Sequence, residues 1–325
     1  MSGVLVEARG LVKHFPVEKS VFSSKNAVVH AVDGVSLTIR EGETLACVGE
    51  SGCGKSTLGR LLIRLIEPTA GTVSFQGEDI TELKAAELRK RKRNMQIIFQ
   101  DPYASLDPRM RVVDIVGEPL VTHRLASGKE LGERVGSLLD MVGLDRSHLS
   151  RYPHMFSGGQ RQRIGIARAL ALDPKFIVCD EPVSALDVSI QSQIINLLLE
   201  LREKKDLTYF FISHDLNVVR HISDSVCVMF LGKVMEYGPT KDVYDRPLHP
   251  YSLFLISAAP VPDPKCRYDD KLILQGEIPS PVNPPAGCRF HTRCPYVQDI
   301  CKHEEPVPRE SAGRYVSCHF PLDPK

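Results

Sequence analysis

The chain has 325 residues, 42% of them hydrophobic, so it is long enough for two or three compact units with a sizeable buried core. Its 41 basic and 40 acidic side chains give a formal net charge of +1, without the basic excess typical of a dedicated nucleic-acid-binding protein. No run of 18 or more apolar residues occurs, and residues 1–7 lack the features of a signal peptide. We therefore expect a protein that stays in the cytoplasm and reaches a membrane only through partners.

The first part of the chain predicts strands that lead into a glycine-rich loop. Residues 1–45 carry β-branched residues and turn signals, which favour short strands. Residues 44–48 form a short apolar run, as expected for a buried parallel strand. Residues 56–66 carry leucines and isoleucines at helical spacing until Pro68 ends the pattern. The local order is therefore strand, loop, helix.

The rest of the chain predicts a helical region within an α/β core, followed by a C-terminal segment of different amino-acid composition. Helical segments recur between about 107 and 172 and favour a helical lobe inserted into the core. Apolar runs at 176–180 and 208–212 favour buried strands, and residues 226–236 favour a strand pair. Toward the C-terminus prolines recur, apolar periodicity fades and cysteines accumulate. We therefore place a domain boundary near residue 245, between a first domain of 1–245 and an extension of 246–325.

The glycine-rich loop at 49–56 reads Gly-Glu-Ser-Gly-Cys-Gly-Lys-Ser and matches G-x-x-x-x-G-K-[ST] at every fixed position. Its glycines allow successive main-chain amides to face phosphate oxygens, and the helix that follows adds its positive end. We expect Lys55 to reach the β- and γ-phosphates of ATP and Ser56 to place its hydroxyl on Mg²⁺. The thiol of Cys53 is interpreted as incidental. The predicted ATP-binding residues of this loop are Gly49, Glu50, Ser51, Gly52, Cys53, Gly54, Lys55, Ser56 and Thr57.

Two acidic residues lie at the end of the apolar run at 176–180. Asp180 ends the run and Glu181 follows it. An acid at the end of a strand can hold Mg²⁺ or its water shell, and the next acid can orient the attacking water. We therefore predict that Asp180 binds the metal and that Glu181 is catalytic.

A second glycine motif, Phe156-Ser157-Gly158-Gly159-Gln160, follows the first along the chain. It resembles the LSGGQ signature of ATP-binding cassette (ABC) ATPases, with phenylalanine in place of the usual leucine. The motifs of this family occur in the family's order across residues 4–240. The others that carry the resemblance are the Walker B strand at 176–181, the Q-loop glutamine Gln100, the D-loop at 184–187 and the switch histidine His214.

The resemblance implies an α/β P-loop NTPase fold with an N-terminal antiparallel β subdomain, an inserted α-helical subdomain at approximately 107–172 and a small Cys-rich extension. It implies a head-to-tail dimer in which the signature of one copy contacts ATP bound by the other. Phe15 lies where the family usually places an aromatic residue against adenine, and Phe22 is the alternative. The implied roles are catalysis by Glu181, His214 and Lys55, Mg²⁺ binding through Ser56, Gln100 and Asp180, and contact with the partner's ATP through Ser157, Gly158, Gly159 and Gln160.

Three further stretches narrow the resemblance. Residues 100–108, 151–156 and 246–251 are similar to the ATP-binding subunits of bacterial dipeptide and oligopeptide importers, and the likeness continues over 279–288. This family implies an ATPase that drives peptide uptake from the cytoplasmic face of the bacterial inner membrane. The implied partners are a second ABC ATPase subunit in a heterodimer, two transmembrane permease subunits and a periplasmic or extracellular substrate-binding protein.

Other functions remain open at this point. The chain itself carries no sign of a peptide site, and cassettes of this kind also serve importers of nickel, glutathione and other solutes. An ABC-type ATPase acting on nucleic acid is disfavoured, because the segment between Gln100 and Ser157 is too short for a long coiled coil and the net charge gives no support. We expect no nucleic-acid partner.

Four cysteines near the C-terminus, Cys288, Cys294, Cys301 and Cys318, follow the spacing C-x5-C-x6-C-x16-C. Four thiolates can bind zinc or hold an iron–sulfur cluster, and this spacing does not select between them. Members of the resembling family hold a [4Fe–4S] cluster at a similar pattern, so the resemblance implies that cluster. Zinc and free thiols are the alternatives, and Cys266 lies outside the spacing.

Overall fold

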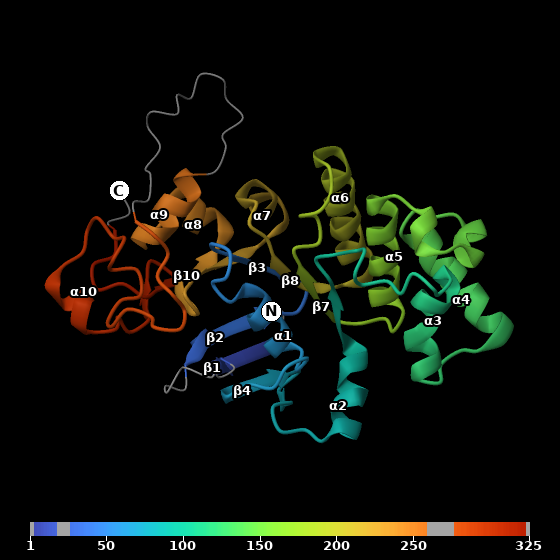
Figure 1. The fold of residues 1–325 in the computed structure, drawn as a ribbon, viewed down its shortest axis with the longest axis horizontal. Coiled ribbons are helices and arrows are strands. Elements are labelled where there is room, and N and C mark those ends of the chain that lie inside the picture. The colour runs from blue at the N-terminus through green and yellow to red at the C-terminus, as the bar shows by residue number, and fades with distance from the viewer. Residues whose placement is uncertain (1–2, 18–26, 259–275, 323–325) are drawn as a thin grey trace. The chain divides into compact units, whose positions relative to one another are not determined.

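The computed structural model describes residues 3–17, 27–258 and 276–322, so the alternatives at Phe22 and Cys266 lie outside the described residues. The chain divides into two compact units. One contains Leu83–Ile212, and the other combines Gly3–Glu82 with the described residues from Ser213 onward. Figure 1 shows the helices and strands of both units. Within the described ranges, no helix combines the length and the apolar character needed to cross a bilayer.

The unit of residues 83–212 contains a parallel sheet. Its strands β6 (Met95–Ile98), β7 (Phe176–Asp180) and β8 (Thr208–Ile212) pair in that order. The second and third strands are buried along their whole length, as is usual for parallel strands that are covered on both faces. The two apolar runs that predicted buried strands are thereby confirmed.

Helices make up most of the rest of this unit. Helix α2 (Ala85–Arg91) carries the basic side chains of residues 89–91 and buries none of its residues, as expected of a solvated helix face. Helices α3 (Val112–Thr122), α4 (Gly128–Met141) and α5 (Gly158–Leu170) pack on one another, and α6 (Val188–Lys205) packs on α5.

The other unit begins with an antiparallel sheet in the order β2-β1-β4-β5, and β1, β2 and β4 lie side by side in Figure 1. The turn signals predicted short strands, but the first two strands each run for 13 residues. Within these strands Gly10 and Gly34, the second of which belongs to the Asp33-Gly34 turn signal, adopt positive φ angles of 57° and 78° beside register shifts. They therefore form bulges within continuous strands instead of turns. The bounds are Val4–Pro16 for β1, Val28–Arg40 for β2, Ala70–Phe75 for β4 and Glu78–Asp79 for β5.

The same unit holds the strand that leads into the glycine-rich loop. Strand β3 (Thr44–Val48) is fully buried and pairs in parallel with β9 (Ser225–Phe230), which forms a hairpin with β10 (Lys233–Pro239). Strand β12 (Arg314–Val316) pairs with β10, and β11 (Arg309–Ser311) pairs with β12, so the C-terminal residues extend this sheet. The helices of this unit are α1 (Lys55–Leu62), α7 (Leu216–Ile222), α8 (Thr240–Asp245), α9 (Pro250–Ser257) and α10 (Asp299–His303).

A buried ion pair joins the C-terminal residues to β10. Arg314 Nη1 lies 3.0 Å from Glu236 Oε1, and the two side chains are 2% and 0% exposed. The same nitrogen donates to the carbonyl oxygens of Asp242 and Arg246. The residues on the two sides of position 245 therefore share one core.

Candidate nucleotide site

The loop between β3 and α1 lies against the backbone of two strands of its own unit. A Cβ at Gly49 would lie 2.1 Å from the Met229 carbonyl oxygen of β9, and a Cβ at Gly54 would lie 2.0 Å from the Ala31 oxygen of β2. Their φ angles are 150° and 105°. Glycine is therefore required at both positions by close approach of the backbone, and at Gly54 also by its conformation.

Lys55 is the first residue of α1, and its side chain turns back into the loop. Its Nζ donates to the carbonyl oxygens of Gly49 at 2.8 Å and Glu50 at 3.1 Å. The residue is 5% exposed. The ammonium group is therefore held at the centre of the loop, where the sequence predicts phosphate binding.

Cys53 belongs to the same loop, and its side chain is buried. Burial raises the pKa of its thiol to about 12, although the nearby Lys55 acts in the opposite direction. A thiol with so high a pKa is a poor nucleophile at neutral pH. The interpretation that this side chain is incidental agrees with its burial.

In the other unit, the structure brings together Gln100 and Glu181. Gln100 Nε2 donates to Glu181 Oε2 at 3.1 Å. Glu181 has a φ of 45°, which is uncommon for a residue with a side chain. Its N–H donates to the Ile212 carbonyl at 3.1 Å, and its own carbonyl accepts from Ser184 N at 3.2 Å. The strained conformation is held by bonds on both sides, and such strain is common at functional sites.

Asp180 is the last residue of β7 and is 2% exposed. The strand therefore ends in a buried carboxylate, and the next residue, Glu181, is more accessible. The D-loop that follows is fixed by Gln191, whose side chain donates to the carbonyls of Val183 and Leu186.

The signature motif forms the N-terminus of α5. Ser157 Oγ accepts from Gln160 N at 3.3 Å, and the Gln160 side chain accepts from Ser157 N at 3.1 Å, so the two residues form a capping box. A Cβ at Gly159 would lie 2.5 Å from Ile190 Cγ2 of α6. Ser157 itself is exposed. The motif is thus ordered by local contacts and leaves its serine on the surface.

The remaining predicted residues, His214 and Phe15, lie in the unit that holds the glycine-rich loop at 49–56, which we call the phosphate loop. His214 is exposed and lies between Ser213, whose N–H donates to the Cys47 carbonyl, and Asp215, which caps α7. Phe15 on β1 is 37% exposed, and Lys13 Nζ lies 5.1 Å from its ring centroid. The loop 49–57, Phe15 and His214 belong to one unit, and Gln100, Asp180, Glu181 and residues 157–160 belong to the other.

The four C-terminal cysteines line one small cavity, together with aromatic and histidine side chains. Burial raises the pKa of Cys288 to about 12 and that of Cys294 to about 11, and neighbouring thiols of the group add to both shifts. Gathered thiols of this kind ionise readily only beside a cation. The donor set therefore suits a metal-containing group. The cysteines of this group are Cys288, Cys294, Cys301 and Cys318.

Among the residues that the structure describes, no three of these four sulfur atoms lie within 4.8 Å of one another. A zinc ion bound by four thiolates at about 2.3 Å holds its sulfurs about 3.8 Å apart. The part of the chain that the structure describes holds one group of three possible ligand atoms within 4.8 Å of one another, and that group does not include these cysteines. The four sulfur atoms therefore do not form a preformed site for one zinc ion.

That close group consists of His14, His30 and Asp33. Asp33 is already paired with Arg289, and Lys233 Nζ lies 3.9 Å from the same carboxylate. Two cations at this carboxylate oppose the binding of a third. We therefore interpret the group as part of an ion-pair network.

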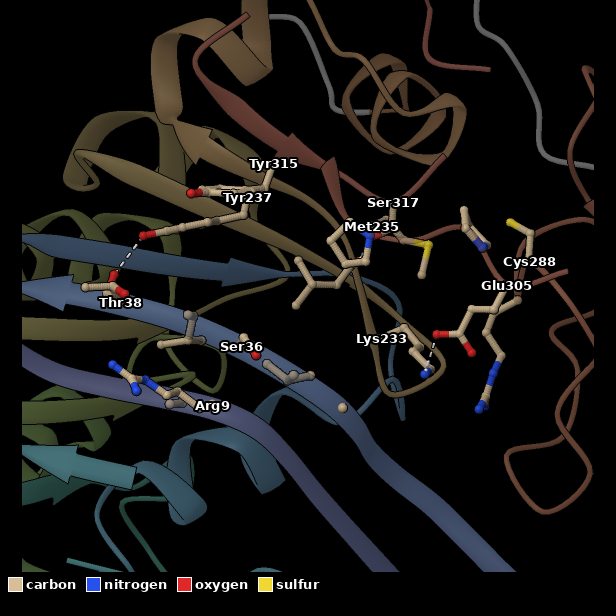
Figure 2. A pocket seen from close by; sticks show the side chains of 18 of the residues that line it. Arg9, Ser36, Thr38, Lys233, Met235, Tyr237, Cys288, Glu305, Tyr315 and Ser317 are labelled. Atoms are coloured by element: carbon tan, nitrogen blue, oxygen red, sulfur yellow. Dashed lines mark hydrogen bonds and ion pairs between the residues drawn. The ribbon is translucent and has the colours of Figure 1, made fainter. Parts of the chain in front are cut away.

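A larger cavity of about 460 Å³ lies between β2 and the C-terminal residues, and Figure 2 shows it from close by. Tyr237 and Tyr315 stack on one side of it, and the Tyr237 hydroxyl donates to the Thr38 carbonyl. Lys233 faces Glu305 at 2.6 Å. Charged side chains that line it, including Arg9 with Glu7 and Arg289 with Asp33, bond to other residues of the same unit. We therefore interpret the cavity as a gap left where segments of this unit pack against one another.

Sequence reasoning missed the residues that connect the C-terminal residues to the phosphate loop. Arg293 pairs with Glu50 of the loop, and the Tyr251 hydroxyl accepts from the Glu50 N–H. No spacing rule links positions so far apart. The available signals were the position of Arg293 beside Cys294 and the place of Tyr251 in the stretch 246–251.

Two family profiles match the chain. One, described as ABC transporter, matches residues 32–184. The other, described as the C-terminal region of oligopeptide/dipeptide transporters, matches residues 235–301. Together they span both glycine motifs and three of the four clustered cysteines.

Curated relatives match the chain over almost its whole length. The oligopeptide transport ATP-binding protein AppF of Bacillus subtilis is 54% identical over 97% of each chain. The oligopeptide transport ATP-binding protein OppF of Salmonella typhimurium is 50% identical over 99% of this chain and 97% of its own. The di/tripeptide transport ATP-binding protein DppF of Pseudomonas aeruginosa is 47% identical over 97% of each.

Among solved structures, the ATP-binding cassette MJ0796 is similar. Its dimer in a post-hydrolysis state bound to ADP and Pi matches with a TM-score of 0.65 and 30% identity, over 73% of this chain and 99% of that chain.

Proposed function

The chain belongs to the ATP-binding proteins of the ABC transporter family, and from that premise we propose that it is the ATP-hydrolysing subunit of an importer of dipeptides or oligopeptides. The observation that carries this proposal is the identity of 47–54% to three peptide-transport ATP-binding proteins over at least 97% of the chain. The match of the C-terminal region supports the same solute class.

We propose that the phosphate loop binds ATP through its main-chain amides and Lys55, with Ser56, Gln100 and Asp180 around Mg²⁺. The buried ammonium group at the centre of the loop supports this role, because positive charge held there needs little reorganisation when a polyanion binds. The remaining contacts proposed for ATP are Phe15 with adenine and, through the main chain, Gly49, Glu50, Ser51, Gly52, Cys53, Gly54 and Thr57.

Glu181 is the proposed residue that orients the attacking water. Its carboxylate lies in a fixed position, because Gln100 donates to one oxygen and the backbone of Glu181 is bonded on both sides. A carboxylate held in this way can accept a hydrogen bond from water that attacks the γ-phosphate. Bound Mg²⁺ supplies charge compensation for the phosphate oxygens. His214 and Lys55 are the other proposed catalytic residues.

The signature motif is proposed to act on ATP held by a second cassette. Ser157 is exposed at the N-terminus of a 13-residue helix, which is favourable for an anion. The dimeric state of the similar cassette, with ADP and Pi bound, is consistent with this arrangement. We propose a heterodimer with a related cassette, held on the cytoplasmic face of the inner membrane by two permease subunits and served by a substrate-binding protein.

For the cysteine cavity we propose a [4Fe–4S] cluster, with zinc as the alternative. The proposal is supported by the gathering of all four cysteines, which lie among the described residues, around one cavity, where no three sulfur atoms lie within 4.8 Å of one another. The test is the metal content of protein purified without oxygen, for the wild type and for Cys294→Ser. Iron and sulfide that are lost in the variant would support the cluster, whereas one zinc without sulfide would contradict it.

Uptake of labelled di- and tripeptides tests the proposed solute class. A strain that lacks this chain should lose the uptake, and the wild-type chain should restore it while Glu181→Gln should not. Loss of nickel or glutathione uptake with peptide uptake intact would assign the cassette to one of the alternative solutes.

A further inference from the structure

We infer that the C-terminal residues form part of the nucleotide site, with Arg293 and Tyr251 as positioning residues for the phosphate loop. The inference rests on the proposed role of this loop in binding ATP. All contacts that carry it lie within one compact unit.

The first contact is an ion pair that neutralises the acidic residue of the loop. Arg293 Nη1 donates to Glu50 Oε2 at 2.7 Å, and the side chains are 6% and 22% exposed. The Arg293 guanidinium also lies over the Phe230 ring, 6.0 Å from its centroid. An unpaired carboxylate in this loop would repel the phosphates of ATP, because like charges in a partly buried site are weakly screened. Arg293 therefore allows an acidic residue to occupy a loop that binds an anion.

The second contact fixes the main chain of the same residue. The N–H of Glu50 donates to the Tyr251 hydroxyl at 3.0 Å. Tyr251 is fully buried in α9, and its ring packs against Phe230 and Phe290 with centroids 4.8 Å and 5.3 Å away. The Glu50 carbonyl in turn accepts from Lys55 Nζ at 3.1 Å. Residues beyond position 245 thus hold the peptide that places the phosphate-binding lysine.

Arg289 forms a parallel link to the other side of the loop. Its Nη1 donates to the Leu231 carbonyl at 3.4 Å, and the next residue, Gly232, donates its N–H to the Cys53 carbonyl at 2.9 Å. Both arginines lie in the segment from Cys288 to Cys294, which is tied to α10 by a bond from Cys288 N to the Cys301 carbonyl. The cysteine segment therefore contacts the loop directly at Glu50 and, through the Leu231–Gly232 peptide, at Cys53.

Binding of Mg–ATP to the purified full chain tests this inference. Arg293→Gln should weaken the affinity about tenfold, because it leaves the Glu50 carboxylate uncompensated beside the phosphates. Arg293→Lys should recover part of the loss, and Glu50→Gln combined with Arg293→Gln should recover most of it. Tyr251→Phe should weaken binding by about threefold, because the Glu50 N–H loses its buried acceptor. Arg309→Gln is the matched control, since Arg309 bonds the His319 carbonyl and not the loop.

Circular dichroism of each variant establishes that it is folded. Wild-type affinity in Arg293→Gln would overturn the inference, and so would a double variant as weak as Arg293→Gln alone, because charge compensation predicts rescue. An equal loss in Arg309→Gln would also contradict it. If the wild-type chain itself does not bind Mg–ATP, the proposed function fails and takes this inference with it.

Discussion

The two glycine motifs of this chain are ordered in opposite ways. The phosphate loop is held from outside, by strands β2 and β9 and by Arg293 and Tyr251. The signature motif is ordered by its own capping box and by the adjacent helix α6, and its serine is exposed. The first therefore depends on distant residues of its unit, whereas the second depends mainly on local sequence.

This contrast fits the proposed roles of the two motifs. A loop that surrounds three phosphates needs its amides and its lysine placed before ATP arrives, and a rigid surrounding supplies that order. A motif that contacts ATP across an interface needs an exposed helix N-terminus, which a local cap provides. Substitutions at residues distant in the sequence, such as Arg293, should therefore impair the phosphate loop. The signature should be most sensitive to substitutions in its own residues and in the adjacent helix α6.

The largest expected effect separates binding from chemistry. Glu181→Gln should reduce ATP turnover by about 10²- to 10⁴-fold, because the amide is a poor acceptor for the proton of the attacking water. Binding of Mg–ATP should persist, since Lys55 and the loop amides are unchanged. Steady-state ATPase rates and equilibrium binding check this, and wild-type turnover in the variant would remove Glu181 from its proposed role.

The second effect tests how strongly the phosphate loop's unit depends on its C-terminal residues. Arg314→Met should lower the free energy of unfolding by about 3–5 kcal/mol, because it leaves the Glu236 carboxylate buried without its partner. Denaturant unfolding measures the change. Adding Glu236→Gln should restore part of the loss, and a double variant less stable than Arg314→Met would contradict the proposed cause.

A smaller effect depends on pH. Burial lowers the pKa of His249 to about 3, and its Nδ1 accepts from the Tyr251 N–H at the start of α9. Because the folded pKa lies below the ordinary value of 6.5, the contribution of His249 to stability is complete above pH 6.5. It is lost as the pH falls toward 3.

The substitution His249→Asn tests this, because asparagine can still accept at the helix start and does not titrate. The variant should lose less stability than the wild type between pH 7 and pH 5, by at most about 1.4 kcal/mol per pH unit. Thermal unfolding at both pH values is the measurement. Equal acid sensitivity of the two proteins would exclude His249 as the titrating group.

The smallest effect concerns the signature. Ser157→Ala should destabilise the start of α5 by about 1 kcal/mol, because the Gln160 N–H loses its cap. ATP binding by the isolated chain should not change. Hydrogen exchange at the first turn of α5 measures the fraying, and Ser157→Asp, which keeps a capping oxygen, is the matched comparison.

Local patterns predicted much of the fold and the family. The glycine loop, the apolar runs of β3, β7 and β8 and the hairpin of β9 and β10 are periodic or short-range signals, and the structure confirms these elements. The likeness to peptide-importer ATP-binding proteins is confirmed by the curated relatives. The roles of the individual site residues stay predictions. The length of the strands in the first sheet was harder to predict, because a glycine such as Gly34 is equally suited to a turn or a bulge.

The sequence by itself predicted the motifs that this protein carries: a glycine-rich loop, an acidic pair at the end of a strand and a signature motif, each encoded within a few adjacent residues. Only the tertiary structure decided what holds the phosphate loop in place. The contacts of Arg293 and Tyr251 with Glu50 join residues more than 200 positions apart. Such pairings arise from the packing of α9 and the cysteine segment against β9, and packing between distant segments leaves no periodic trace in the chain.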